Sequence, residues 1–139
     1  ITGANLVKHS YGGLMNKAEP ELLKEISDLL MANRKDIFID IHQLRAWRSG
    51  NLIHIDFHLI LPRDFSLECA HRENKALEKI IQEYFGGRAS VMIHLDPCLD
   101  QECPICSQSP CMLRHSPQDN LVKWSLSSMT ADQTNNKTD

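Results

Sequence analysis

The segment LIHIDFHLIL, residues 52–61, alternates apolar and polar side chains over most of its length. A period of two is typical of a β-strand with one buried face. Five apolar side chains would share the core face: Ile53, Ile55, Phe57, Leu59 and Leu61. The opposite face would carry His54, Asp56, His58 and Ile60. The strand therefore places two histidines and a carboxylate on the face away from the core.

Two further strands are predicted beside this one. Residues 37–48, IFIDIHQLRAWR, are rich in β-branched and aromatic residues, and the turn residues 49–51 join them to residues 52–61 as a hairpin. Residues 89–95, ASVMIHL, form a third strand with Val91 and Ile93 facing the core. That phase puts His94 and Asp96 on the opposite face.

Two amphipathic helices complete the pattern. The first begins near Pro20, which suits the first position of a helix, and buries Leu22, Leu23, Ile26, Leu29 and Leu30. The second is capped by Ser66 and stopped by Gly86 and Gly87. Its expected buried stripe is Leu67, Ala70, Leu77, Ile80, Ile81 and Tyr84. The order helix, strand, strand, helix, strand predicts an α+β open-faced sandwich with both helices on one sheet face and the other face bare.

Composition narrows the class of protein. A chain of 139 residues suits one domain with tails, and a net charge of -3 argues against a nucleic-acid partner. No apolar run reaches the roughly 18 residues of a membrane-spanning helix. Without an export signal, the five cysteines are expected to be reduced thiols. No nucleophile elbow, phosphate-binding glycine loop or HExxH motif favours an enzyme or a small-molecule substrate.

Histidines and one carboxylate on the bare face suggest a metal site. His58 and the pair His94 and Asp96 lie on two strands of the same face, and imidazole with carboxylate suits Zn²⁺. Any one of these histidines taken alone is more often an exposed or core side chain with ordinary hydrogen bonds than a metal ligand. The set considered for the site is His42, His58, His71, His94 and Asp96.

A cluster of four cysteines follows in residues 98–115, and we predict that this segment is a metal-binding loop. Cys98, Cys103, Cys106 and Cys111 have the spacing C-x4-C-x2-C-x4-C, and four thiolates so placed can surround one ion. An iron–sulfur centre, a redox pair at Cys103 and Cys106, two disulfides or unused thiols are the alternatives. Residues 116–139 are predicted to be a mostly disordered tail, within which Leu121, Val122, Trp124 and Leu126 could dock as one short segment.

The ordered spacing of several motifs resembles one known family. These motifs are His42-x-Leu44-Arg45 with Ser49-Gly50, then His58, then Ala70-His71, then Ile93-His94-x-Asp96-Pro97-Cys98. Over residues 14–98 the chain is similar to the cytoplasmic domain of cation diffusion facilitator transporters.

The resemblance implies a ferredoxin-like, metallochaperone-like domain over residues 19–97 that forms a V-shaped homodimer. It implies that residues 1–18 link this domain to the transporter's transmembrane domain, which lies outside this sequence. The domain would itself be soluble, at the cytoplasmic face of an inner or plasma membrane in a bacterium. By matching position, His42, His58, His71, His94 and Asp96 correspond to the family's cytoplasmic metal ligands.

The expected function is therefore regulation of a divalent-cation efflux transporter. Metal at the homodimer interface would close the dimer and activate transport. Zn²⁺ suits the ligands best, and Fe²⁺, Co²⁺, Ni²⁺, Cu²⁺ and Mn²⁺ are the other ions considered. A soluble metallochaperone, or a thiol redox or iron–sulfur protein using Cys98–Cys111, is the alternative.

Overall fold

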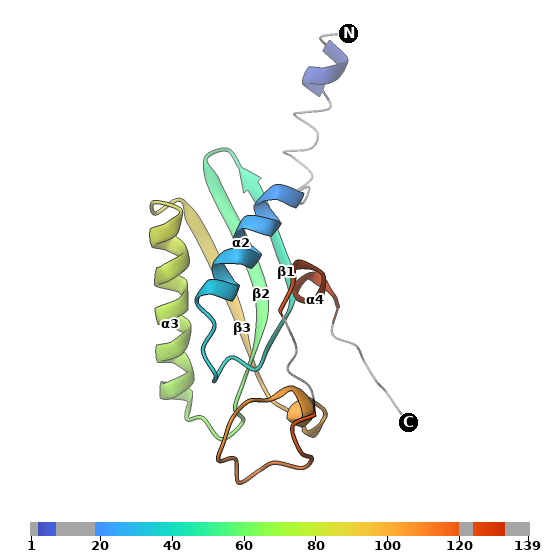
Figure 1. Cartoon of the computed structure of the whole chain (residues 1–139). Coiled ribbons are helices and arrows are strands. Elements are labelled where there is room, and N and C mark those ends of the chain that lie inside the picture. Colours follow the sequence, from blue (N-terminus) through green and yellow to red (C-terminus); the bar gives the residue numbers. More distant parts are fainter. Residues whose placement is uncertain (1–2, 8–18, 120–123, 133–139) are drawn as a thin grey trace.

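A three-stranded sheet lies at the centre of the computed structural model, which describes residues 3–7, 19–119 and 124–132 (Figure 1). Its strands are β1 (Asp40–Ser49), β2 (Leu52–Leu61) and β3 (Ala89–Pro97), in the order β1-β2-β3. β2 pairs antiparallel with β1 and parallel with β3. The predicted hairpin and third strand are confirmed, although β1 begins three residues later than expected and β3 continues to Pro97. Most of the linker predicted over residues 1–18 lies outside the described residues.

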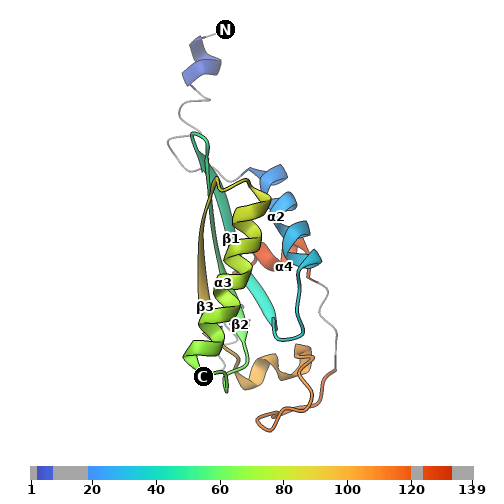
Figure 2. The same ribbon diagram turned by 90° about the vertical axis from the view of Figure 1, so that its left-hand side faces the viewer.

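Two long helices cover one face of this sheet (Figure 2). They are α2 (Pro20–Ala32) and α3 (Leu67–Tyr84), and α3 makes the crossover that parallel pairing of β2 and β3 requires. Their buried side chains meet the core face of β2, where Ile55, Phe57 and Leu59 are almost fully enclosed. The α+β open-faced sandwich is confirmed.

The predicted buried stripe of α3 is wrong at both ends. Leu67 is 84% exposed and Tyr84 is 52% exposed, whereas Leu77 and Ile81 are buried as expected. Leu67 is the first residue of the helix, directly after the Ser66 cap. Tyr84 turns its hydroxyl toward α2 and donates a hydrogen bond to Glu25 Oε1 at 3.1 Å. The large side chains that α3 buries in the core therefore come from its C-terminal half.

A short helix in the predicted tail packs into the same core. α4 (Leu126–Thr130) buries Met129 completely, and Trp124 just before it is only 5% exposed. Arg34 lies over the Trp124 ring, 4.3 Å from its centroid. Trp124 is thus docked as expected, and the docked segment continues beyond the predicted Leu126 to Met129, because these side chains supply apolar surface that β1 and α2 can bury. Leu121 and Val122 lie outside the described residues.

The open sheet face is not wholly bare, which corrects the prediction. Ile60 at the end of β2 is 3% exposed and packs with Ile39 and Cys106. The loop after β3 therefore covers this end of the face, and the short 3-10 helix η1 (Asp100–Ile105) belongs to that loop. Among the described residues, the helices are too short or too polar to cross a lipid bilayer.

Candidate metal centre

Three histidines form a row across the open face of the sheet. His42 on β1 pairs with His58 on β2, and His58 pairs with His94 on β3. Paired residues in neighbouring strands share a face, so the imidazole rings stack in sequence. Ring centroids lie 5.1 Å apart between His42 and His58, and 4.7 Å apart between His58 and His94. The strand register at these positions therefore brings the three side chains together.

A β-bulge in β1 turns His42 onto this face. The register shifts between His42 and Arg45, and Gln43 has a positive φ of 53°. The extra residue reverses the alternation, so that His42 lies on the open face while Leu44 and Ala46 lie in the core. The Gln43 N–H donates a hydrogen bond to the carbonyl of Ala131 at 2.9 Å. The segment that follows α4 thus holds the bulge beside His42.

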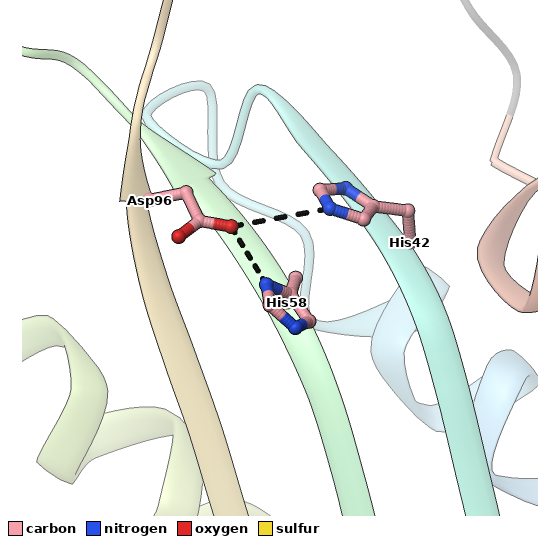
Figure 3. Close-up of side chains that lie close together, drawn as sticks. All are labelled: His42, His58 and Asp96. Carbon is pink, nitrogen blue, oxygen red and sulfur yellow. Dashed lines mark hydrogen bonds and ion pairs between the residues drawn. The ribbon is translucent and has the colours of Figure 1, made fainter. Parts of the chain in front are cut away.

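Asp96 on β3 completes a group of three possible ligands (Figure 3). Its Oδ2 lies 2.7 Å from Nδ1 of His58 and 3.9 Å from Nε2 of His42. One ligand atom from each of the three residues lies within 4.8 Å of the others. Two imidazoles and one carboxylate, each from a different strand, are a donor set that fits Zn²⁺ or a similar divalent ion.

His42 is the most constrained member of this group. Its side chain is 5% exposed, and its Nε2 has no hydrogen-bond partner. Burial lowers the pKa of His42, the neighbouring His58 lowers it further, and Asp96 opposes both effects. The imidazole is therefore kept neutral, which is the form that binds a metal ion. A buried nitrogen without a partner is costly in a folded protein and suits a position that accepts a ligand.

Asp56 is a further polar residue of the face and is not among the predicted ligands. Its Oδ1 lies 3.0 Å from Nε2 of His94, but the contact is poorly aligned and the oxygen has no hydrogen-bond partner. Its Oδ2 lies 3.4 Å from Nη2 of Arg45. The period-two pattern of residues 52–61 already placed Asp56 beside His58, and this was the signal that could have included it.

The other two histidines of the predicted set lie outside the group of three. His94 is 43% exposed in its side chain and reaches the group only through its stacking on His58. His71 is exposed in the first turns of α3, on a different element from the row. The described fold therefore brings together His42, His58 and Asp96, with His94 beside them, and leaves His71 apart.

The comparisons with known proteins identify the family of this domain. A family model described as cation efflux protein, cytoplasmic domain, matches residues 18–98. The chain belongs to the cation efflux proteins. The predicted resemblance to cation diffusion facilitator transporters is confirmed, and the matched residues form the cytoplasmic domain of such a protein.

Two individual proteins illustrate the similarity. A solved structure of CzrB, a proposed zinc transporter, aligns with a TM-score of 0.54 and 28% identity, over 58% of this chain and 98% of that one. An uncharacterized transporter of Synechocystis sp., sll1263, is 25% identical over 99 residues, or 71% of this chain. The chain spans 32% of the length of that transporter.

The four clustered cysteines lie at or beyond the end of the match to the cation efflux family. Cys98 is its last residue, and Cys103, Cys106 and Cys111 follow it. All four are free thiols that line one hollow below the sheet, but among the described residues no three of them form a close group like that of His42, His58 and Asp96. Burial raises the pKa of the Cys98 thiol. Metal binding by this thiol would therefore release a proton at neutral pH.

Proposed function

We propose that this cytoplasmic domain binds a divalent metal ion, Zn²⁺ in the first place, at His42, His58 and Asp96. Binding between two copies of the chain would regulate divalent-cation efflux by a transmembrane domain of the same protein. The observation that carries this proposal is the convergence of three ligand atoms from three strands, within 4.8 Å, on a face that α2 and α3 leave open. The domain acts as a sensor in this scheme and carries out no chemical reaction.

The chain's own residues prepare the site before metal arrives. The hydrogen bond between His58 Nδ1 and Asp96 Oδ2 orients both side chains, and burial keeps His42 neutral. The bulge at Gln43 fixes the direction of His42. A bound ion would supply a fixed positive charge, and a side chain of a second copy could coordinate it. Side chains already held in position lose little conformational entropy on binding, which favours affinity.

The exposure of the site supports a dimeric arrangement. His58 and Asp96 are half-buried, and His94 is exposed on the same face. Three protein ligands leave a tetrahedral Zn²⁺ ion one open position. Met92, on the same face of β3, is 61% exposed and supplies apolar surface for a partner. A second copy could therefore complete the coordination and cover this face.

Regulation follows if metal binds more tightly to the closed dimer than to the open one. An effector shifts a two-state equilibrium only by the difference between its two affinities, and couplings of about 1–3 kcal/mol are typical. The similarity to CzrB, a proposed zinc transporter, supports Zn²⁺ as the first ion to test. Fe²⁺, Co²⁺, Ni²⁺, Cu²⁺ and Mn²⁺ remain ions for comparison because their ligand preferences overlap.

Titration calorimetry tests the proposal. The protein should carry serine at Cys98, Cys103, Cys106 and Cys111, so that thiols do not contribute to the signal. We expect Zn²⁺ binding in this background, loss of binding in H42A and in H58A, and retention in the matched control H54A, which changes a histidine of β2 outside the group. Equal Zn²⁺ affinity in all four proteins would refute the site.

Sedimentation velocity tests the second half of the proposal. We expect Zn²⁺ to raise the dimer fraction or to make a preformed dimer more compact, in the same background and in H54A. The effect should be absent in H58A, whose half-buried side chain can be removed with little damage to the core. A metal-bound protein that stays monomeric at all concentrations would contradict binding between two chains.

A further inference from the structure

Four cysteines surround a hollow that the proposed regulatory site does not use. Cys98 directly follows β3, Cys103 and Cys106 belong to the loop around η1, and Cys111 closes the segment. Arg63 and Arg114 line the same hollow. Cys103 and Cys106 are buried, and Cys98 and Cys111 are half-buried. The thiol groups that are spaced along the sequence thus share one location in the fold.

A tight backbone turn brings Cys103 and Cys106 close to each other. The Cys106 N–H donates to the Cys103 carbonyl at 3.4 Å, which closes the turn Cys103-Pro104-Ile105-Cys106. The His115 N–H donates to Sγ of Cys103 at 3.4 Å. This contact holds the sulfur of Cys103 in position within the loop.

Arg114 holds this loop in place from the side. Its guanidinium donates four hydrogen bonds, all to backbone carbonyls: Cys103, Cys106, Gln108 and Ser116, at 2.8–3.4 Å. These carbonyls lie in irregular backbone that has no sheet or long helix to satisfy them. One side chain therefore links both ends of the loop and puts a permanent positive charge beside the cysteines.

A second arginine fixes the loop from the main body of the domain. Arg63, just after β2, forms an ion pair with Asp100 at 2.9 Å and donates to the Leu113 carbonyl at 2.9 Å. Four thiolates around a divalent ion carry a net charge of -2, and Asp64 and Glu102 also line the hollow. The Arg63 charge is already paired with Asp100, so Arg114, whose hydrogen bonds all go to neutral carbonyls, is the cation that would offset part of the thiolate charge.

We propose that Cys98, Cys103, Cys106 and Cys111 bind one thiol-seeking divalent ion of the Zn²⁺ class, as a second site separate from His42, His58 and Asp96. Four ligands within a loop of 14 residues, counted from Cys98 to Cys111, match the closed tetrahedral sites that stabilise small loops. The sulfurs do not form a preset close group, so the loop contracts onto the ion. Binding would stabilise the loop that packs Cys106 against Ile60.

Cobalt substitution tests this proposal with a signal that belongs to thiolates. The reduced 139-residue protein is titrated with Co²⁺ without oxygen, and the absorption spectrum is recorded. We expect sulfur-to-cobalt charge-transfer bands together with the visible bands of tetrahedral Co²⁺, both removed by added Zn²⁺. The bands should be lost in C103S/C106S and kept in the matched control C69S, whose cysteine lies on α3 away from the hollow.

The two sites are separated by the same measurement. H58A should leave the charge-transfer bands intact, because His58 contributes no sulfur, so failure of the histidine site does not affect this result. Co²⁺ binding without charge-transfer bands in the wild type would overturn the proposal. Purified protein with the brown absorption of an iron–sulfur centre, or with two disulfides that persist in mild reductant, would also overturn it.

Alkylation of the wild type avoids reliance on a variant that fails to fold. The rate of modification at each cysteine is measured by peptide mass spectrometry with and without Zn²⁺. We expect Zn²⁺ to slow modification at the four loop cysteines together by tenfold or more, and to leave Cys69 unchanged. Unchanged rates at the loop cysteines would refute the site.

Discussion

Replacing His42 with leucine is expected to change the stability of the domain in opposite directions without and with metal. The His42 side chain is almost completely buried, yet its Nε2 has no hydrogen-bond partner and its pKa is lowered by burial. Leucine has a similar volume and carries no polar atom. In the absence of metal, the substitution therefore removes a cost rather than a favourable contact.

The size of the effect follows from two opposing contributions. An unsatisfied buried polar group costs about 1–3 kcal/mol. The ring contact between His42 and His58, with centroids 5.1 Å apart, is lost in the variant and is worth roughly 0.5–1.5 kcal/mol. The difference predicts that the metal-free variant is about 1 kcal/mol more stable than the wild type.

Metal should make the wild type more stable than the H42L variant, the reverse of the order in chelator. An ion at 100 times its dissociation constant stabilises the folded state that binds it by about 2.7 kcal/mol. The wild type gains this contribution and the variant does not, so the wild type should become the more stable by about 1.7 kcal/mol, which is the 2.7 less the 1. Urea denaturation in excess chelator and in excess Zn²⁺, with the four loop cysteines changed to serine, measures both differences.

The matched control is H54L, at a half-buried histidine on the same face that stacks on Trp47 outside the ligand group. It should keep the full Zn²⁺-induced shift. The reasoning is refuted if H42L is clearly less stable than the wild type in chelator and still gains stability from Zn²⁺. That result would make His42 a structural residue and not a ligand.

Three further perturbations have defined outcomes. In chelator, the free energy of unfolding should fall on acidification, because the pKa of His42 is lower in the folded state than in the unfolded state. The stability contributed by neutral His42 is present above the unfolded pKa of about 6.5 and is lost as pH falls through the folded pKa. An H42L protein should therefore show a flatter pH profile of urea midpoints. Trp124→Ala should lower the free energy of unfolding in urea by about 3–5 kcal/mol because Trp124 is buried. The same variant should weaken Zn²⁺ binding in calorimetry, because it loosens the hydrogen bond from the Gln43 N–H to Ala131. Unchanged Zn²⁺ affinity would argue against a link between Trp124 and the bulge beside His42. Gln43→Gly should raise stability slightly, by up to about 1 kcal/mol, whereas Gln43→Val should lower it, because only glycine adopts a φ of 53° without strain; equal urea midpoints would contradict the strained bulge.

Local signals predicted most of the architecture. The alternation of residues 52–61 predicted β2, Pro20 and Ser66 predicted the starts of two helices, and Gly86 and Gly87 predicted where α3 ends. Each of these depends on a few neighbouring residues. Leu67 and Tyr84 were placed wrongly because helical periodicity does not show how far the sheet extends beneath a helix. Their exposure is decided by tertiary packing.

The geometry of the bulge at Gln43 could not be predicted from local sequence. The apolar positions do change phase between Ile41 and Leu44, but this change does not show which residue is extra, and glutamine has no preference for a positive φ. The conformation depends on pairing with β2 and on the contact of the Gln43 N–H with Ala131, far along the chain. Without the bulge, His42 and Leu44 would lie on the same face. The sequence thus identified His42 as a candidate ligand but did not show how it reaches the site.

The core face of β2 explains why the polar face can hold an unsatisfied histidine. Burial of Ile55, Phe57 and Leu59 contributes about 1.5–3 kcal/mol for each side chain. A slip of one residue in register would move all three to the open face, and this loss exceeds the roughly 1–3 kcal/mol cost of an unpartnered His42 nitrogen. The register that stacks His42, His58 and His94 is therefore fixed by hydrophobic side chains on the other side of the sheet. The same register holds the unpartnered Nε2 of His42 at the proposed metal site.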